Sequence, residues 1–279
     1  MIYLILAVLG SILIPVVIRY SKGKVNDVFG MYFCNYVVCV VTGLIWMGEF
    51  KPFSYGNDMK PVFIIGFITG ILYLASLAYY DKCIDKAGLV LTSIFKKVSM
   101  IIPIIIAVVI FKNELKITHI TGISLSIFAI VLINYNKKSF SKIDFLGILI
   151  LNLLFSGLAD SMKNVFNELC APGLINYFTL FSFMIAALCT AIMMLVKKNK
   201  IGKYEILYGA AFGVPNYFTA NFLTIALTKM NPVIAYPAFF MLSMIGTTMA
   251  GIILFKEKLD TKKIIAIIIV IIAMIILNI

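Results

Sequence analysis

The sequence predicts an all-α integral membrane protein, and three observations lead to this fold class. Of the 279 residues, 62% are hydrophobic and 13% are charged, whereas soluble domains average about 45–50% apolar and about 25% charged residues. Ten apolar runs follow one another, each close to the length that crosses a bilayer as a helix. The second half of the chain repeats features of the first half. We therefore expect ten transmembrane helices around a central cavity.

The apolar runs set the boundaries of the expected helices. Long runs with few turn residues inside them favour helices over an outer-membrane barrel. The net charge of +12 does not indicate a nucleic-acid partner, because the lysines gather in the connections, where basic residues face anionic lipid. The expected helices span residues 2–20, 28–48, 60–80, 87–110, 117–135, 144–166, 174–196, 204–228, 232–255 and 261–279.

Internal repetition organises these helices into two halves. The sequence IFKNEL at 110–115 recurs as LFKEKL at 254–259. Because five helices is an odd number, the second copy must enter the membrane upside down, which is the inverted repeat of many secondary transporters. We therefore predict two five-helix repeats, 1–139 and 140–279, in one membrane domain. Matching pairs are Ser99 with Ser243 and Tyr73 with Tyr217 at a shift of 144 residues, and Gly10 with Gly157 at a shift of 147.

Two adjacent lysines, Lys96 and Lys97, lie deep inside the apolar run 87–110. If that helix starts near Ala87, Lys96 is roughly 13 Å from its end, near the middle of a hydrocarbon core about 30 Å thick. A charge there costs at least ~2.5–3.5 kcal/mol, so it requires a partner or a wet cavity. Neighbouring side chains point about 100° apart, and only Lys96 shares the polar stripe that contains Ser99. We expect Lys96 to contact a substrate and Lys97 to contribute less.

Polar stripes at helical spacing supply the other candidate site residues. Spacings of three and four residues place side chains on one helix face, and polar faces in a membrane point at each other or at a cavity. Two alternatives remain open: an ion pair within one helix for Asp160 and Lys163, and hydrogen bonds between helices for the tyrosines and asparagines. The candidates for substrate binding are Asn35, Tyr73, Tyr80, Asp160, Lys163, Tyr217, Asn221 and Tyr236, together with Lys96 and Lys97.

Ten helices, a five-plus-five repeat and an apolar helix ending in FKNEL at 111–115 resemble the EamA branch of the drug/metabolite transporter superfamily. The pair Lys96-Lys97 also resembles a basic pair that sugar-phosphate carriers of this superfamily use to hold phosphate. Those carriers have it in the second repeat, where this chain has Phe240 and Met241. The first helix is similar to that of small multidrug resistance proteins, whose proton-coupling glutamate is replaced here by Ser11.

These features predict a secondary transporter that moves a small polar or amphipathic metabolite, with an anionic group opposite Lys96, by alternating access. The alternatives are export of a cationic drug, an amine or an amino acid, a membrane-embedded enzyme, and a helical scaffold without transport. A single histidine and few acidic residues in the loops argue against an enzyme. We expect no cofactor or metal, a proton or exchanged solute as coupling partner, a monomer or weak homodimer, and a multi-pass location in a bacterial plasma membrane.

Charge in the connections predicts the orientation of the chain. Basic residues gather in odd-numbered connections, for example at 19–24, 137–142 and 197–203, whereas even-numbered connections contain few. By the positive-inside rule the odd connections face the cytoplasm, so both termini lie outside. The family resemblance implies the opposite orientation, with both termini inside.

Overall fold

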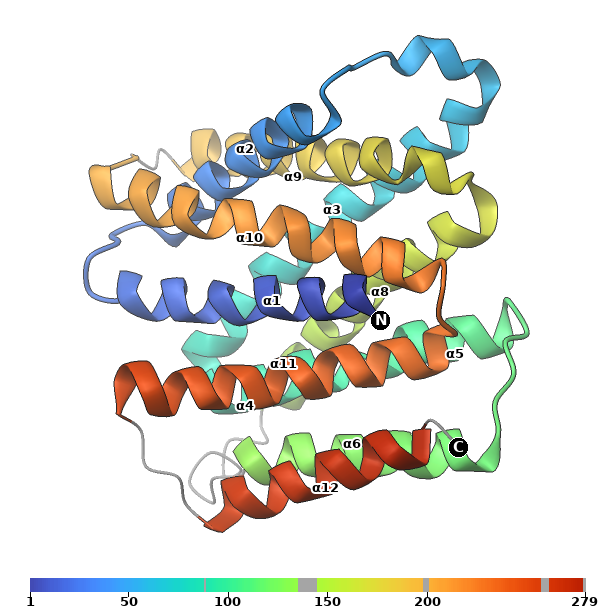
Figure 1. Cartoon of the computed structure of the whole chain (residues 1–279). Helices are drawn as coiled ribbons and strands as arrows, with labels where there is room; N and C mark the ends of the chain where they lie inside the picture. Colours follow the sequence, from blue (N-terminus) through green and yellow to red (C-terminus); the bar gives the residue numbers. More distant parts are fainter. Residues whose placement is uncertain (88, 135–144, 198–200, 257–260, 278–279) are drawn as a thin grey trace. The chain divides into compact units, whose positions relative to one another are not determined.

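The computed structural model describes residues 1–87, 89–134, 145–197, 201–256 and 261–277. Within these ranges no residue belongs to a β-strand, which confirms the predicted all-α class. Six of the described helices are long and apolar enough to cross a membrane (Figure 1). They are α1 (Ile2–Ser21), α2 (Val28–Met47), α3 (Met59–Ala87), α8 (Leu146–Leu169), α9 (Ile175–Lys197) and α11 (Pro232–Phe255).

The remaining described elements complete the chain. Two short 3₁₀ helices, η1 and η3, precede α3 and α9 and were not predicted. The predicted boundary between the repeats, at residues 139 and 140, lies outside the described residues, as do the basic residues expected at 137–142 and at positions 198 and 200. The elements are η1 (Pro52–Asp58), α4 (Leu89–Val98), α5 (Ile101–Val109), α6 (Ile117–Asn134), η3 (Pro172–Leu174), α10 (Lys203–Leu227) and α12 (Thr261–Leu277).

The expectation of one helix over 87–110 was wrong. Helix α4 ends at Val98 and α5 begins at Ile101. The Ser99 hydroxyl donates to the carbonyl oxygen of Lys96 at 2.6 Å, and the Ser99 carbonyl accepts from the N–H of Ile102 at 3.0 Å. Pro103 has no N–H with which to form the α-helical bond to that carbonyl, so the chain makes a tighter turn there.

The chain forms two compact units, each of which draws helices from both ends of the sequence. Unit 1 comprises Met1–Leu74 and Val165–Lys229, and unit 2 comprises Ala75–Asn164 and Met230–Ile279. Unit 1 therefore contains α1, α2, the first part of α3, the end of α8, α9 and α10. Unit 2 contains the rest of α3, α4, α5, α6, most of α8, α11 and α12.

In unit 1, helix α3 approaches α9 at two glycines. A Cβ atom added at Gly70 would lie 2.5 Å from the Cβ of Ile185 and 2.8 Å from the carbonyl oxygen of Ser182. One added at Gly66 would lie 3.1 Å from the Cβ of Phe181 and 3.5 Å from the Ser182 nitrogen. The helices can come this close only because glycine has no side chain, which is a common device of helix pairs in membranes.

Helix α10 approaches α2 in the same way, again within unit 1 (Figure 1). A Cβ atom at Gly213 would lie 2.7 Å from the Cβ of Val38 and 2.9 Å from the carbonyl oxygen of Asn35. One at Gly209 would lie 2.6 Å from the Cβ of Cys34 and 3.1 Å from the Asn35 nitrogen. These contacts fix the spacing of the helices on which the polar residues of unit 1 lie.

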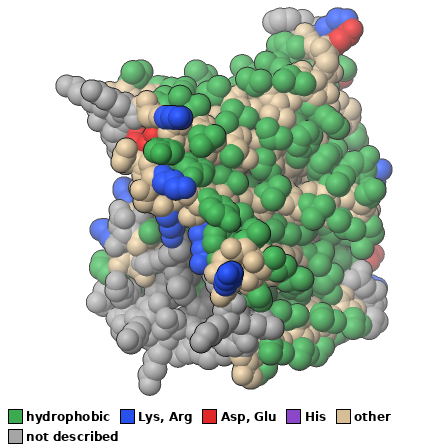
Figure 2. Space-filling view, turned by 60° about the vertical axis from the view of Figure 1, so that its left-hand side comes forward, with side chains coloured by type: hydrophobic (Ala, Val, Ile, Leu, Met, Phe, Trp, Pro, Cys, Tyr) green, Lys and Arg blue, Asp and Glu red, His purple; other side chains and the backbone are tan. Residues whose placement is uncertain are grey.

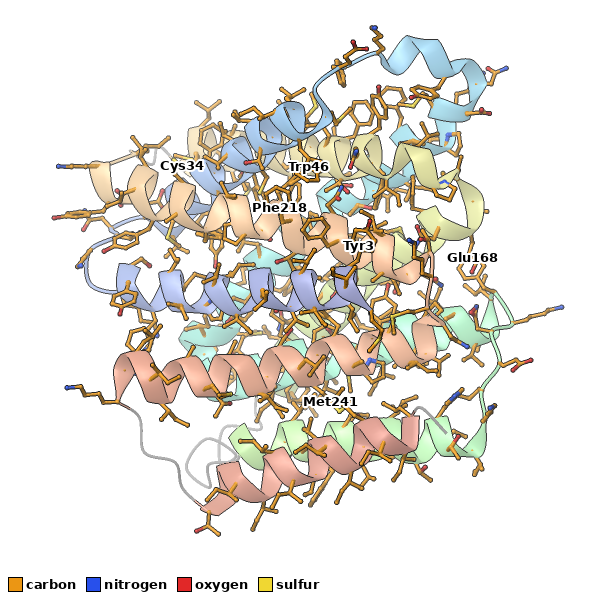
Figure 3. The ribbon with its side chains drawn as sticks, in the orientation of Figure 1. Tyr3, Cys34, Trp46, Glu168, Phe218 and Met241 are labelled. Atoms are coloured by element: carbon orange, nitrogen blue, oxygen red, sulfur yellow. The ribbon has the colours of Figure 1, made fainter. Side chains whose placement is uncertain are left out.

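Exposed apolar side chains dominate the described surface, as Figure 2 shows for one face. Near the end of α2, Trp46 is 52% exposed and packs edge to face on Phe218 of α10, with ring centroids 5.1 Å apart (Figure 3). Exposed aromatic residues at helix ends are typical of the membrane interface. This surface is compatible with a membrane location.

In unit 2, helices α6 and α12 lie side by side (Figure 1). Gly122 of α6 faces Leu277 of α12, and both helices contribute to an apolar cluster that also includes Met241 of α11. From Ile264 onward the exposed residues of α12 are apolar, and Ile272, for example, is 45% exposed. A helix with such a face is suited to contact with lipid.

Candidate functional site

A polar stripe runs along α8 in unit 2. Asn152, Ser156, Asp160 and Asn164 recur every fourth residue, which places them on one side of the helix. All except Asp160 are buried, and Lys163 next to Asn164 is buried as well. Polar and charged groups buried in an apolar helix require partners. The partners of this stripe define the candidate site.

The charged members of the stripe pair with each other. The Lys163 ammonium lies 2.7 Å from Oδ1 of Asp160, with the lysine side chain 4% exposed and the aspartate side chain 26% exposed. This is the ion pair within one helix that the three-residue spacing allows. The hydroxyl of the buried Tyr236 on α11 donates to the Asp160 carbonyl oxygen at 2.8 Å. Three predicted site residues, Asp160, Lys163 and Tyr236, thus meet in one place.

The lysine pair lies on the last turn of α4, directly before the break in the helix. Lys96 is exposed and Lys97 is half-buried, whereas Ser99 and Met100 beyond them are buried. The Lys96 ammonium lies over the ring of Tyr80 on α3, 4.5 Å from the ring centroid. An aromatic face attracts a cation without neutralising its charge. The contact with Tyr80 therefore does not supply a counter-charge for Lys96.

Neutral polar groups of α3 and α8 join the two charged features. The hydroxyls of Ser76 and Ser156 are 2.7 Å apart and hydrogen-bonded. Neither the amide nitrogen nor the amide oxygen of Asn152 has a hydrogen-bond partner among the described residues. The same holds, within the described part of the chain, for the amide nitrogen of Asn164. A buried amide without partners costs about 1–3 kcal/mol, so these groups are suited to bind water or a polar solute.

The site contains charged and polar groups that can bind a ligand. The described side chains of α4, α5 and α11 and of α8 up to Asn164 include three lysines and one carboxylate, that of Asp160. Positive charge, hydroxyls and an unpartnered amide can hold an anionic or polar group near the break in the helix.

Four further predicted site residues, Asn35, Tyr73, Tyr217 and Asn221, belong to unit 1. Tyr73 stacks on Phe183 with ring centroids 5.6 Å apart. Tyr217 is fully buried, and within the described residues its hydroxyl has no hydrogen-bond partner. The structure therefore divides the ten predicted residues between the two units instead of gathering them in one.

The asparagines of unit 1 form hydrogen bonds between helices, which is the alternative that the sequence left open. Asn35 accepts from the amide nitrogen of Asn216 at 3.1 Å, and Asn221 donates to Asn176 at 2.8 Å. Asn176 and Asn216 were not among the site residues predicted from the sequence. Asn216 directly precedes Tyr217, but no helical spacing identifies it as the partner of a residue on α2.

The buried Asn164 was also missed, although it continues the four-residue spacing of the α8 stripe beyond Asp160. Ser76 and Asn152 lie on stripes that the sequence reveals, but their serine and asparagine side chains are common in membrane helices and did not distinguish them. The helical spacing could have found all three, because each lies on the same face as a predicted residue.

Comparison with known proteins gives a fold and no activity. No family model matches the chain. An uncharacterized protein of Haemophilus influenzae is 23% identical over 269 residues, covering 92% of this chain and 90% of that protein. A protein with a solved crystal structure, described without a function, superposes with a TM-score of 0.76 at 11% identity, covering 99% of this chain and 94% of that chain. The fold is therefore shared over nearly the whole chain.

Proposed function

We propose that this protein is a secondary transporter of the bacterial plasma membrane, built from ten membrane helices in two inverted five-helix repeats. In this reading α4 and α5 form one broken membrane helix, and a small polar or amphipathic solute with an anionic group binds beside the break. The observation that carries the proposal is the pair Lys96-Lys97 on the last turn before that break. Interrupted helices with charged groups near the middle of the membrane are characteristic of transporter binding sites.

The two glycine contacts of unit 1 support the inverted repeat. Gly209 and Gly213 of α10 follow Gly66 and Gly70 of α3 by 143 residues, and the atoms that face them are equivalent. On α2 and α9 the residues that face these glycines are 147 residues apart: Cys34 with Phe181, Asn35 with Ser182, and Val38 with Ile185. Helix α2 thus packs on α10 as α9 packs on α3. A two-fold axis between the repeats generates this reciprocity.

The repeat register in this contact differs by one residue from that found by aligning the sequence. The glycines relate α3 to α10 at a shift of 143, whereas Tyr73 coincides with Tyr217 at 144. In a helix one residue corresponds to about 100° of rotation. We therefore treat the glycine-bearing faces of α3 and α10 as equivalent in the two repeats. In that alignment Tyr73 and Tyr217 do not occupy equivalent positions on their helices.

Charge in unit 2 supports an anionic group on the solute. The Asp160 carboxylate is paired with Lys163 at 2.7 Å, which leaves Lys96 and Lys97 without a carboxylate partner among the described side chains of α4, α5, α8 and α11. A positive charge in an apolar surrounding is stabilised by an incoming anion. Lys96 is the better candidate for direct contact because it is exposed and its ammonium group lies over the ring of Tyr80.

The decisive experiment removes the charge of Lys96 and keeps its length. The purified chain is first screened for ligands by thermal shift with anionic and cationic metabolites, and flux of each ligand is then measured in proteoliposomes. We expect Lys96→Met to abolish binding and flux of an anionic solute while leaving the melting temperature of the empty protein nearly unchanged. Lys97→Met is the matched control, and we expect it to do less because it is half-buried on another face.

Wild-type flux of the anionic solute in Lys96→Met would overturn the assignment of Lys96. Absence of flux for every ligand that binds would instead favour a membrane-embedded enzyme or a scaffold. Flux measured with the purified chain alone separates these possibilities, because a secondary transporter requires no ATP-hydrolysing partner.

A cationic or zwitterionic solute, such as an amine or an amino acid, is the second candidate. The ring of Tyr80 already holds an ammonium group, and the Asp160 carboxylate is 26% exposed. An ammonium group on the solute could replace that of Lys96 on this ring. For such a solute we expect Lys96→Met to strengthen binding, which is the opposite of the result expected for an anion.

The orientation proposed from the lysine distribution places both termini outside the cytoplasm. A single cysteine at position 198, introduced after the five native cysteines are replaced, tests it in intact cells. We expect Lys198→Cys to resist an impermeant thiol reagent until the cells are opened. Labelling before opening would support the reverse orientation, with both termini inside.

A further inference from the structure

A group of uncharged polar residues in unit 1 occurs where three helices begin or end. Asn167 lies in the last turn of α8, Asn176 in the first turn of α9, and Thr224 in the last turn of α10. Asn221 lies one turn before Thr224 on α10, and both are completely buried. We refer to Asn167, Asn176, Asn221 and Thr224 as the amide cluster.

Hydrogen bonds fix the amides of this cluster. The amide nitrogen of Asn167 donates to the Thr224 carbonyl oxygen at 3.0 Å, and the amide nitrogen of Asn221 donates to Oδ1 of Asn176 at 2.8 Å. The Asn167 amide cannot be turned over, because its oxygen would then face another acceptor. Its nitrogen therefore faces the Thr224 carbonyl, and its oxygen remains available to accept or to bind a cation.

Two oxygens of the cluster are shielded from solvent and unused. Within the described part of the chain, Oδ1 of Asn167 and Oδ1 of Asn221 accept no hydrogen bond. Leaving a buried acceptor without a partner destabilises the folded state. A ligand that accepts electron pairs from neutral oxygens would remove this penalty.

The surroundings favour a small cation over an anion. Helices α8 and α10 both end at the cluster, and helix C-termini carry partial negative charge; the start of α9 offsets part of it. The carboxylate nearest in sequence, Glu168, belongs to an exposed residue (Figure 3). Amide, hydroxyl and carbonyl oxygens without a carboxylate suit a monovalent cation better than Ca²⁺ or Mg²⁺, whose protein sites use carboxylates.

We propose that the amide cluster binds a small monovalent cation through the amide oxygens of Asn167 and Asn221. The inference does not depend on the proposed solute or on Lys96, because it concerns unit 1 alone and predicts binding to the empty protein. Ion sites in transporters commonly use helix C-termini and main-chain carbonyls. A cation bound here ties the ends of α8 and α10 together.

Thermal unfolding of the purified full-length chain tests the proposal. Melting temperatures are measured in sodium, potassium, ammonium or choline chloride at equal ionic strength, with choline as the reference that is too large to bind. At a cation concentration of about ten times its Kd, we expect at least one small cation to raise the melting temperature by roughly 4 °C, and the rise to saturate at higher concentrations. A rise in sodium or potassium chloride would indicate a metal-ion site, and a rise in ammonium chloride alone would indicate a site for an ammonium group.

Substitutions show which residues the cation-dependent rise in melting temperature requires. We expect Asn221→Ala, and the milder Asn167→Ala at the half-buried end of α8, to lose the cation-dependent rise. Asn216→Ala is the matched control: it removes another amide hydrogen bond of unit 1, at 3.1 Å from Asn35, and should lower the starting melting temperature without changing the rise. Equal melting temperatures in all four salts, or an undiminished rise in Asn167→Ala, would overturn the proposal.

Discussion

Unit 1 and unit 2 accommodate polar side chains in an apolar setting in two different ways. In unit 1, helices approach at glycines such as Gly70 and Gly213, and asparagines form hydrogen bonds between helices. In unit 2, a helix is interrupted after Lys96 and Lys97, and a buried ion pair lies on α8. Beside Gly70 and Gly213 the polar residues, Ser182 and Asn35, are neutral.

The difference indicates which unit is suited to a ligand with charge. A charge in a membrane helix requires water, a counter-charge or a bound partner. The break after α4 lies next to two lysines, whereas the glycine contacts of unit 1 hold the helices close together. We therefore expect substitutions in unit 1 to act mainly on stability and those around Lys96 to act mainly on binding.

The sharpest test of this contrast is the ion pair of unit 2. We expect Asp160→Asn to lower the free energy of unfolding by about 3–5 kcal/mol, because the buried Lys163 loses the carboxylate that lies 2.7 Å from its ammonium group. Lys163→Met should cost less, because the Asp160 side chain is 26% exposed and keeps access to solvent. Reversible unfolding in mixed detergent micelles measures both effects.

The double variant Asp160→Asn, Lys163→Met is the control for this prediction. It leaves no uncompensated charge, so we expect it to recover most of the stability that Asp160→Asn loses. A double variant as unstable as the single one would mean that Lys163 has another counter-charge.

Glycine substitutions test the reciprocity of the contacts in unit 1. We expect Gly70→Ala and Gly213→Ala each to destabilise by about 1–3 kcal/mol, because the new Cβ would overlap Ile185 in one case and Val38 in the other. The melting temperature of each purified variant measures the effect. Gly147→Ala on α8 is the control, since no atom lies within 4 Å of its added Cβ, and it should be neutral or slightly stabilising.

Similar losses of stability in Gly70→Ala and Gly213→Ala would support two equivalent interfaces. A large loss in one variant with none in the other would show that the two contacts differ in stability, and the repeat would then rest on sequence alone.

The smallest expected effect comes from a buried tyrosine of unit 1. Tyr217→Phe removes a hydroxyl that has no hydrogen-bond partner among the described residues, so we expect a change between zero and a gain of about 1 kcal/mol. Tyr177→Phe is the matched control, because its hydroxyl accepts from the N–H of Lys51 at 3.1 Å and its loss should cost about 0.5–1.5 kcal/mol. Calorimetry of both variants compares them. A clear loss in Tyr217→Phe would place a bound water or solute at that hydroxyl.

Local features of this protein could be predicted from the sequence because they depend on residues near one another in the chain. The apolar runs predicted the all-α class, since a long apolar segment satisfies its backbone most simply as a helix. The spacing of Asp160 and Lys163 allowed an ion pair within one turn, and the structure contains it. The stripe on α8 was visible for the same reason, because helical period alone places its members on one face.

Only the tertiary structure decided which of these residues have partners. Asn35 bonds to Asn216 and Asn221 to Asn176 across helices that are far apart in sequence, and no periodicity encodes which helix lies opposite. The break after Val98 depends on the hydroxyl of Ser99 as well as on Pro103, and prolines are otherwise tolerated inside membrane helices, as Pro215 is in α10. Packing between distant segments sets these contacts, because the energy of a side-chain pair depends on the distance and direction between its atoms, which the fold alone supplies.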